Sequence, residues 1–144
     1  MPREVKYVIY VKSPDTFIST LHLGLGSLSI KPLCKVDIIR TKDMTRLSLL
    51  EERTILRLSK LKQGVKGLPQ IDIDVNEIRD LRVVDLRKSY LRRYEEVIAR
   101  LLRAREDEEI YVMTFRDKSR VHTLILKKDH LYVVKRFLKE SGLF

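Results

Sequence analysis

The sequence has few of the residues that stabilise secreted proteins or mark common cofactor sites. It contains one cysteine, no tryptophan, one asparagine and two glutamines in 144 residues. The single thiol, Cys34, excludes an internal disulfide and is typical of a reducing cytoplasm. No apolar run reaches the roughly 18 to 20 residues of a membrane-spanning helix, and the run at residues 7–11 is too short for a signal peptide. We therefore expect a cytoplasmic globular protein.

Charged residues, in contrast, are abundant. Lysine and arginine number 30 against 20 acidic residues, which gives a net charge of +10 in a chain that is 35% charged. A positive surplus indicates an anionic partner, which could be nucleic acid, an acidic protein surface or a lipid headgroup. Many ions and few amides are also typical of thermophilic proteins. The sequence leaves both explanations of the charge open.

Length and apolar content predict one domain. A chain of 144 residues with 44% apolar residues is long enough to bury a core, and it shows no repeat, low-complexity run or linker, so we expect residues 1–144 to form a single α+β domain. Strands are expected at residues 5–11, 17–25, 28–30 and 35–40, with a short helix as an alternative for the second. Residues 45–62 fit either one helix or two strands.

The middle of the chain alternates and then becomes helical. Apolar and polar residues alternate over Ile71–Asn76, which predicts a half-buried strand, and residues 80–86 predict another. Ser89 is a suitable N-cap for a helix that runs to about Arg105. The buried stripe of that helix would hold Leu91, Tyr94, Ile98 and Leu101 or Leu102.

The last third of the chain predicts two strands and a helix. Residues 109–115 and 121–127 are strands joined by a short polar turn, and they precede a helix that Asp129 would cap. One face of this helix is apolar and needs a partner; it holds Leu131, Val134, Phe137 and Leu138. Gly142 is placed to end the helix in a left-handed conformation.

The order of apolar segments from Ile71 to Ile78, through the strand near Leu81–Val84, to the closing hairpin and helix resembles the pleckstrin-homology-like (PH-like) barrel superfamily. The resemblance covers residues 47–142 and implies a curved antiparallel sheet closed by the C-terminal helix, with residues 1–40 adding strands. The chain departs from the family in its inserted helix, at about 89–105, and in Phe137, where many members have tryptophan. Members mostly bind peptides, acidic lipids or other proteins, and some belong to nucleic-acid assemblies.

Signals for catalysis or metal binding are weak. Asp72–Asn76 imitates a calcium loop, but Glu77 and Val83 replace the required glycine and bidentate glutamate. Gly24–Gly26 matches only part of a dinucleotide-binding fingerprint. The three histidines, His22, His122 and His130, have no metal-ligand spacing. We therefore expect no catalytic residue, no metal and no cofactor, which makes an enzyme the least favoured class.

Two basic clusters carry the functional prediction. Residues 82–105 contain eight basic and three acidic residues. The expected helix places Arg93, Arg100 and Arg103 on one exposed line, and arginine makes bidentate contacts to phosphate. The predicted anion-binding residues are Arg92, Arg93, Arg100, Arg103, Lys60, Lys62 and Lys66, the lysines lying in a glycine-containing loop. An acidic run, Glu106–Glu109, would repel phosphate beside them.

The sequence thus favours a non-enzymatic module that contacts nucleic acid or a nucleoprotein assembly. Exposed aromatic residues for base stacking are not evident in the sequence, so contacts to the backbone are expected to dominate over sequence reading. Two alternatives stay open at this point: a protein–protein adaptor that binds a peptide along a sheet edge or beside the closing helix, and a module that binds acidic lipids.

Overall fold

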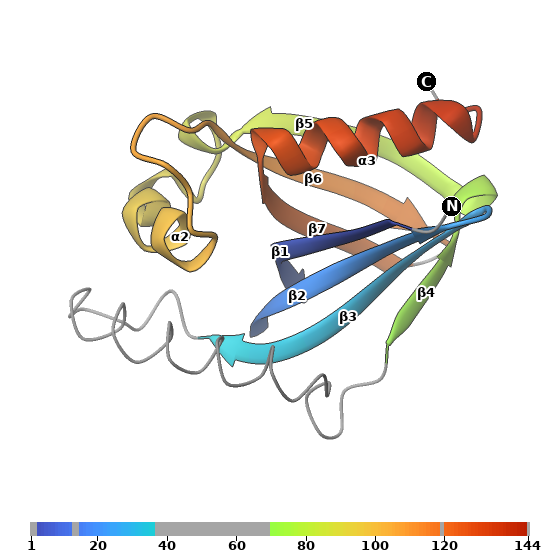
Figure 1. Ribbon diagram of the computed structural model, residues 1–144, viewed down its shortest axis with the longest axis horizontal. Coiled ribbons are helices and arrows are strands. Elements are labelled where there is room, and N and C mark those ends of the chain that lie inside the picture. The colour runs from blue at the N-terminus through green and yellow to red at the C-terminus, as the bar shows by residue number, and fades with distance from the viewer. Residues whose placement is uncertain (1–2, 13–14, 37–69, 119, 144) are drawn as a thin grey trace.

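The computed structural model describes residues 3–12, 15–36, 70–118 and 120–143. These ranges form seven strands and two α-helices, with short 3₁₀ helices between some of them (Figure 1). The strands are β1 (Arg3–Lys12), β2 (Asp15–Gly24), β3 (Ser27–Val36), β4 (Ile71–Asp74), β5 (Ile78–Asp85), β6 (Ile110–Asp117) and β7 (Arg120–Lys127). The α-helices are α2 (Glu95–Leu101) and α3 (Lys128–Glu140).

The seven strands form one antiparallel sheet with the order β4-β3-β2-β1-β7-β6-β5. The sheet curls into a half-barrel, and α3 lies along it as the C-terminal helix (Figure 1). β1 is the central strand of this order, because it is hydrogen-bonded to β7 as well as to β2. The α+β class and the single curved antiparallel sheet are confirmed.

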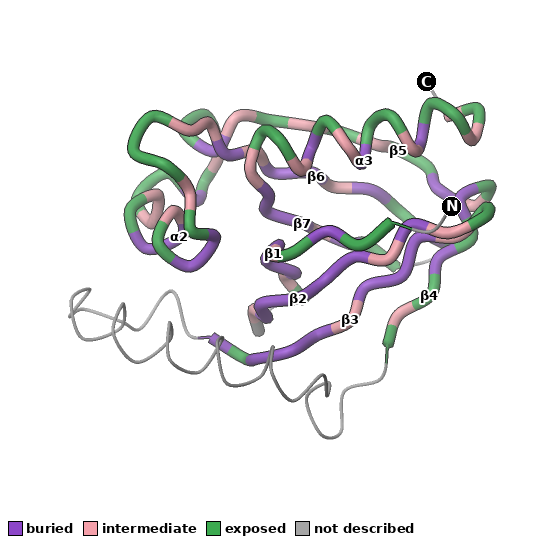
Figure 2. The backbone as a smooth tube through the Cα atoms, in the orientation of Figure 1, coloured by how far each residue is buried: buried purple, intermediate pink, exposed green. Residues whose placement is uncertain are grey.

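Alternation along the strands sends side chains to two separate apolar clusters. On β6, Met113 and Phe115 belong to the first cluster, and Ile110 and Val112 belong to the second. The first cluster includes the apolar face of α3, and the second includes that of α2. Both faces of the sheet are therefore covered, so the middle strands contain long buried stretches (Figure 2).

The C-terminal hairpin and helix agree with the sequence prediction. Leu131, Val134 and Leu138 are buried in the first cluster, and Phe137 packs against it partly exposed. The predicted cap is wrong, because the helix begins at Lys128, its N-cap Lys127 makes no side-chain hydrogen bond, and Asp129 lies inside the first turn. There its charge still suits the positive end of the helix dipole.

The inserted helix is shorter than predicted. Instead of one helix over residues 89–105, the chain forms 3₁₀ helices at Leu86–Lys88 and Arg92–Tyr94 and then the seven-residue α2. The Ser89 hydroxyl donates to the Leu86 carbonyl oxygen at 2.7 Å and accepts from the Leu91 N–H at 3.1 Å. This local turn competes with a helix start at Ser89. Apolar spacing alone does not distinguish an α-helix from successive 3₁₀ turns.

Two further strand boundaries differ from the prediction. Residues 28–30 and 35–40 were expected as separate strands on either side of Pro32, but β3 continues through the proline to Val36. A bulge accommodates the proline, because Ile18 pairs with Cys34 whereas Ser19 pairs with Pro32.

The question of one helix or two strands at residues 45–62 falls outside the described residues. Among those residues, no helix is long and apolar enough to cross a membrane.

Gly142 ends α3 as predicted, with a φ of +89°. The Leu143 N–H donates to the Leu138 carbonyl oxygen at 3.0 Å, and the Gly142 N–H donates to that of Lys139 at 3.0 Å. A side chain at this φ costs about 1–2 kcal/mol. We expect Gly142→Ala to lower the free energy of unfolding by that amount in urea denaturation. Gly24→Ala is the control, since Gly24 has no positive φ and open space around its Cα; an equal loss in both variants would contradict the assignment.

Candidate functional site

The segment that joins β5 to β6 carries the densest group of basic side chains in the described chain. We call residues 86–105 the cationic segment; it contains seven basic and two acidic residues. Leu86, Ile98 and Leu102 fix it to the second apolar cluster and are at most 1% exposed. These apolar residues are buried, whereas all seven basic residues of the segment are exposed (Figure 2).

Some of the arginines are neutralised within the molecule. Arg87 Nε lies 3.0 Å from Glu95 Oε1, and an Arg100 guanidinium nitrogen lies 3.4 Å from Glu96 Oε1. Arg105 reaches carboxylates on two sides, Glu108 at 3.7 Å and Asp129 at 3.5 Å. Both glutamates of the cationic segment are thus engaged. Arg100, one of the predicted binding residues, is already paired.

Four cations of the segment have no carboxylate partner among the described residues: Lys88, Arg92, Arg93 and Arg103, all of them exposed. Arg92 and Arg93 precede α2 in a 3₁₀ helix. Arg103 follows it with a φ of +56°, so the predicted single line of Arg93, Arg100 and Arg103 on one helix is wrong. The cations instead flank a helix about 10 Å long.

The second predicted cluster, Lys60, Lys62 and Lys66, lies outside the described residues. In the acidic run Glu106–Glu109, beside the cationic segment, only the last two residues are paired with other groups of the described chain. The Arg105 N–H donates to Glu108 Oε1 at 3.0 Å, and Glu109 lies 3.7 Å from Lys128 Nζ. Glu106 and Asp107 are exposed and have no ion pair among the described residues. Their negative charge therefore persists at the end of the cationic segment.

Sequence reasoning missed two exposed aromatic side chains. Tyr90, in the cationic segment, is 74% exposed, and Tyr132, on α3, is 68% exposed. Tyrosine is compatible with the core or the surface, so its type alone does not reveal exposure. The helical spacing of α3 was the available signal, because Tyr132 lies off the stripe formed by Leu131, Val134 and Leu138.

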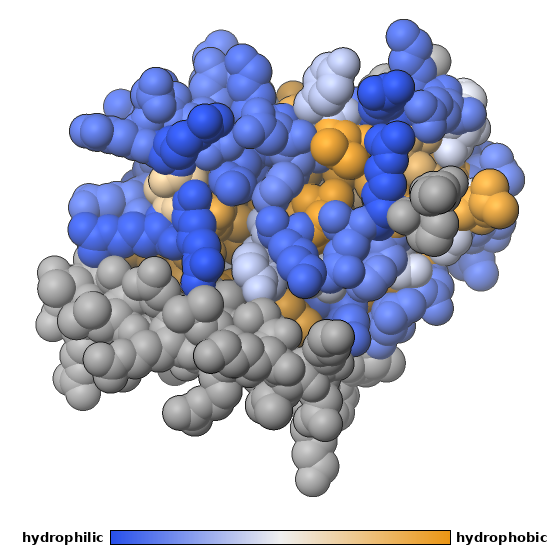
Figure 3. All heavy atoms as spheres, in the orientation of Figure 1, coloured by the Kyte–Doolittle hydropathy of each residue, from blue (hydrophilic) through white to orange (hydrophobic). Residues whose placement is uncertain are grey.

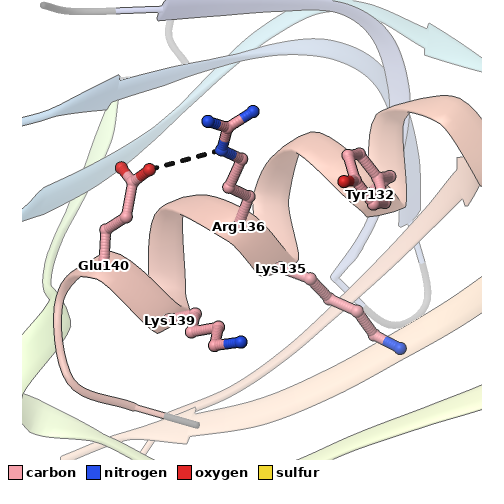
Figure 4. A pocket seen from close by; sticks show the side chains of 5 residues that line it. All are labelled: Tyr132, Lys135, Arg136, Lys139 and Glu140. Atoms are coloured by element: carbon pink, nitrogen blue, oxygen red, sulfur yellow. Dashed lines mark ion pairs between the residues drawn. The ribbon is translucent and has the colours of Figure 1, made fainter.

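The outer face of α3 forms a shallow hollow of about 560 Å³. Its lining residues are Tyr132, Lys135, Arg136, Lys139 and Glu140. Arg136 Nε lies 3.4 Å from Glu140 Oε1, whereas Lys135 and Lys139 extend away from this ion pair (Figure 4). No ion pair involves these two lysines among the described residues. The outer face thus presents two available cations beside an exposed ring.

A second open hollow, also of about 560 Å³, lies where β1 begins beside α3. Arg3, Val5, Lys6 and His130 are among its lining residues. Figure 3 shows hydrophobic atoms exposed between α3 and the strands below it, framed by hydrophilic side chains. Burial lowers the pKa of His130 below its ordinary value, so its imidazole is neutral at pH 7 and adds no positive charge to this hollow.

The strongest cluster of titratable groups is buried. Tyr10 Oη lies 2.9 Å from His122 Nδ1, and His122 Nε2 lies 3.7 Å from Asp117 Oδ2, which is also paired with Arg120. His122 is 2% and Asp117 1% exposed, so a dissolved substrate does not reach either group. Burial is the main cause that lowers the pKa of His122. This arrangement affects stability rather than surface chemistry.

The two aspartate side chains of the calcium-like motif accept local hydrogen bonds. Asp72 Oδ1 accepts from the Ser29 hydroxyl at 2.6 Å and from Gln70 at 2.9 Å, and Asp74 caps a 3₁₀ helix by accepting from the Asn76 N–H. In the described part of the chain, no group of three or more histidine, cysteine or acidic side chains could hold a metal ion. The alternation of the strand accounts for the aspartate spacing.

Comparison of the chain with protein-family models, with curated proteins and with solved structures gave no match.

Proposed function

We propose that this chain is a non-enzymatic binding module that contacts the phosphate backbone of nucleic acid, either free or within a nucleoprotein assembly. The observation that supports this proposal most strongly is the set of exposed cations without a carboxylate partner in the cationic segment: Lys88, Arg92, Arg93 and Arg103. Exposed cations without a carboxylate partner are available to phosphate without first breaking an internal ion pair.

The half-barrel and its closing helix support an assignment to the PH-like superfamily, with which they are compatible. That assignment agrees with a binding role, because these folds position loops and edges on a rigid sheet. It does not select the partner. The exposed cations support an anionic partner, and we place the contact on the cationic segment.

We predict that the triple variant Arg92→Ala, Arg93→Ala, Arg103→Ala weakens nucleic-acid binding by at least about tenfold. Each lost phosphate contact should also reduce the slope of log affinity against log salt by about 0.7 to 0.9. The measurement is fluorescence anisotropy with a labelled oligonucleotide of about 16 nucleotides, at salt concentrations from about 50 to 200 mM.

A control of opposite sign is available in the neighbouring acidic run. Glu106→Gln with Asp107→Asn removes two exposed negative charges and should strengthen binding. The proposal is wrong if the wild type shows no binding at low salt, or if its affinity does not depend on salt. A high melting temperature together with no binding would instead support the thermophilic explanation of the charge.

One observation favours a second candidate, the protein–protein adaptor. β5 is the last strand of the sheet, and its outer edge has no partner among the described residues. Arg79, Asp80 and Arg82 are exposed on it, so a peptide that pairs with this edge must carry charges complementary to these. This function is favoured if a protein partner binds in stoichiometric amount and its affinity is unchanged when Arg93, Arg100 and Arg103 are replaced by glutamate. If the protein sediments with anionic vesicles, and the variant with glutamate at these three arginines does not, acidic-lipid binding is favoured.

A further inference from the structure

The exposed apolar residues of the described chain are few, and two of them are aromatic. They are Leu25, Val84, Tyr90, Val121 and Tyr132. Both tyrosines belong to cationic clusters. Tyr90 lies within three residues of Lys88, Arg92 and Arg93, and Tyr132 lines the hollow that contains Lys135 and Lys139. The aromatic exposure thus coincides with the positive charge at two separate places.

We infer that these two places bind single-stranded nucleic acid, with bases stacked on Tyr90 and Tyr132 and phosphates on the neighbouring cations. This inference depends on the proposed function and specifies its ligand. Exposed rings between cations are the combination that single-strand binders use, since every base has a face that stacks on an aromatic ring. A duplex offers only phosphates to such a surface, because its bases are already stacked on each other.

The geometry of α3 is suited to this contact. Lys135 and Tyr132 are three residues apart, and Lys139 is seven residues from Tyr132, so the three side chains lie along one side of the helix over about two turns. Tyr132 and the lysines line the same hollow (Figure 4). Arg136 contributes less, because Glu140 already pairs with it at 3.4 Å.

The two places are connected where the end of the cationic segment meets the first turn of α3. Arg105, at the end of the cationic segment, lies 3.5 Å from Asp129 in the first turn of α3. The Lys128 N–H also donates to the Glu109 carbonyl oxygen at 2.9 Å. Glu106 and Asp107 lie in the connection and carry negative charge, so we expect a strand to contact the two cationic clusters and to pass these acids without touching them.

The test is anisotropy titration of a labelled single strand and of the matching duplex, each of about 16 nucleotides, with wild type and tyrosine variants. Tyr90→Ala and Tyr132→Ala should each weaken single-strand binding by roughly 5- to 100-fold. Tyr90→Phe and Tyr132→Phe should retain most of the affinity, because the ring is kept. The salt slope should stay unchanged in all four variants, since no phosphate contact is removed.

Leu25→Ala is the matched control, because Leu25 is fully exposed but lies in the turn between β2 and β3 and belongs to neither cluster. Its affinity should equal that of the wild type. The inference is overturned if the alanine variants at the tyrosines also bind like wild type, or if the duplex binds as tightly as the single strand. In either case the proposed function survives. Absence of binding to both probes overturns the inference and the proposed function together.

Discussion

Aspartate in place of Val134 is expected to unfold the protein or to lower its melting temperature by roughly 10 °C or more. Val134 is fully buried in the first apolar cluster, on the face of α3 that packs on the curved sheet. A carboxylate there loses its hydration inside an apolar cluster, which costs several kcal/mol. The whole stability of a domain is only about 5–15 kcal/mol, so this loss is decisive.

The adjacent residue provides the control for this prediction. Lys135→Asp introduces the same carboxylate one position along the same helix, but Lys135 is exposed. Its effect on the free energy of unfolding should stay within about 0.5 kcal/mol. Circular dichroism melting of both variants is the measurement. A Val134→Asp protein that melts within a few degrees of wild type would mean that α3 does not close the sheet.

The second large effect is a loss of stability at mildly acidic pH. Burial lowers the pKa of His122 in the folded protein below the value of about 6.5 that it has when unfolded. The unfolded state therefore binds the proton more readily as the pH falls below that value. The free energy of unfolding should decrease by up to about 1.4 kcal/mol per pH unit for this group. His130, whose pKa burial also lowers, acts in the same direction.

The charged groups around His122 explain why it stays neutral. Arg120 and Lys12 oppose a second positive charge, whereas Asp117 favours one, and burial exceeds that attraction. Urea unfolding between about pH 7.5 and 5.5 should show a smaller pH slope in His122→Gln than in wild type. Tyr10→Phe removes the hydrogen-bond partner and keeps the imidazole, so its slope should remain. Identical slopes for wild type and His122→Gln would refute the prediction.

The closing hairpin, α3 and the Gly142 terminus could be predicted from sequence because each depends on local patterns. Alternation, helical spacing and a left-handed glycine report local backbone geometry directly. The inserted helix was predicted too long, since an apolar stripe from Leu91 to Leu102 also suits 3₁₀ turns that a serine side chain interrupts. Asp129 was mistaken for a cap because aspartate is favoured both at the N-cap position and within the first turn of a helix.

The candidate site was less predictable, because it depends on which side chains find partners in the folded chain. The i,i+4 spacing of Glu96 and Arg100 predicts the ion pair that forms between them, but sequence alone did not show that Arg92, Arg93 and Arg103 lack a carboxylate partner among the described residues. It also gave no sign that Tyr90 is exposed, which is a property of the tertiary packing, whereas the helical spacing of α3 was a signal for Tyr132. Ion pairs such as Arg105 with Asp129 join residues 24 positions apart, beyond any local pattern.

The pairing of β1 with β7 has a consequence for how the chain assembles. Only Ile9–Val11 and Thr123–Ile125 form this ladder, whereas every other neighbouring pair of strands is consecutive in the chain. The two sets of strands, β1 to β4 and β5 to β7, can therefore pair independently of each other. Their union requires a loop of more than a hundred residues to close, so the half-barrel becomes continuous only when the last strand has joined the first.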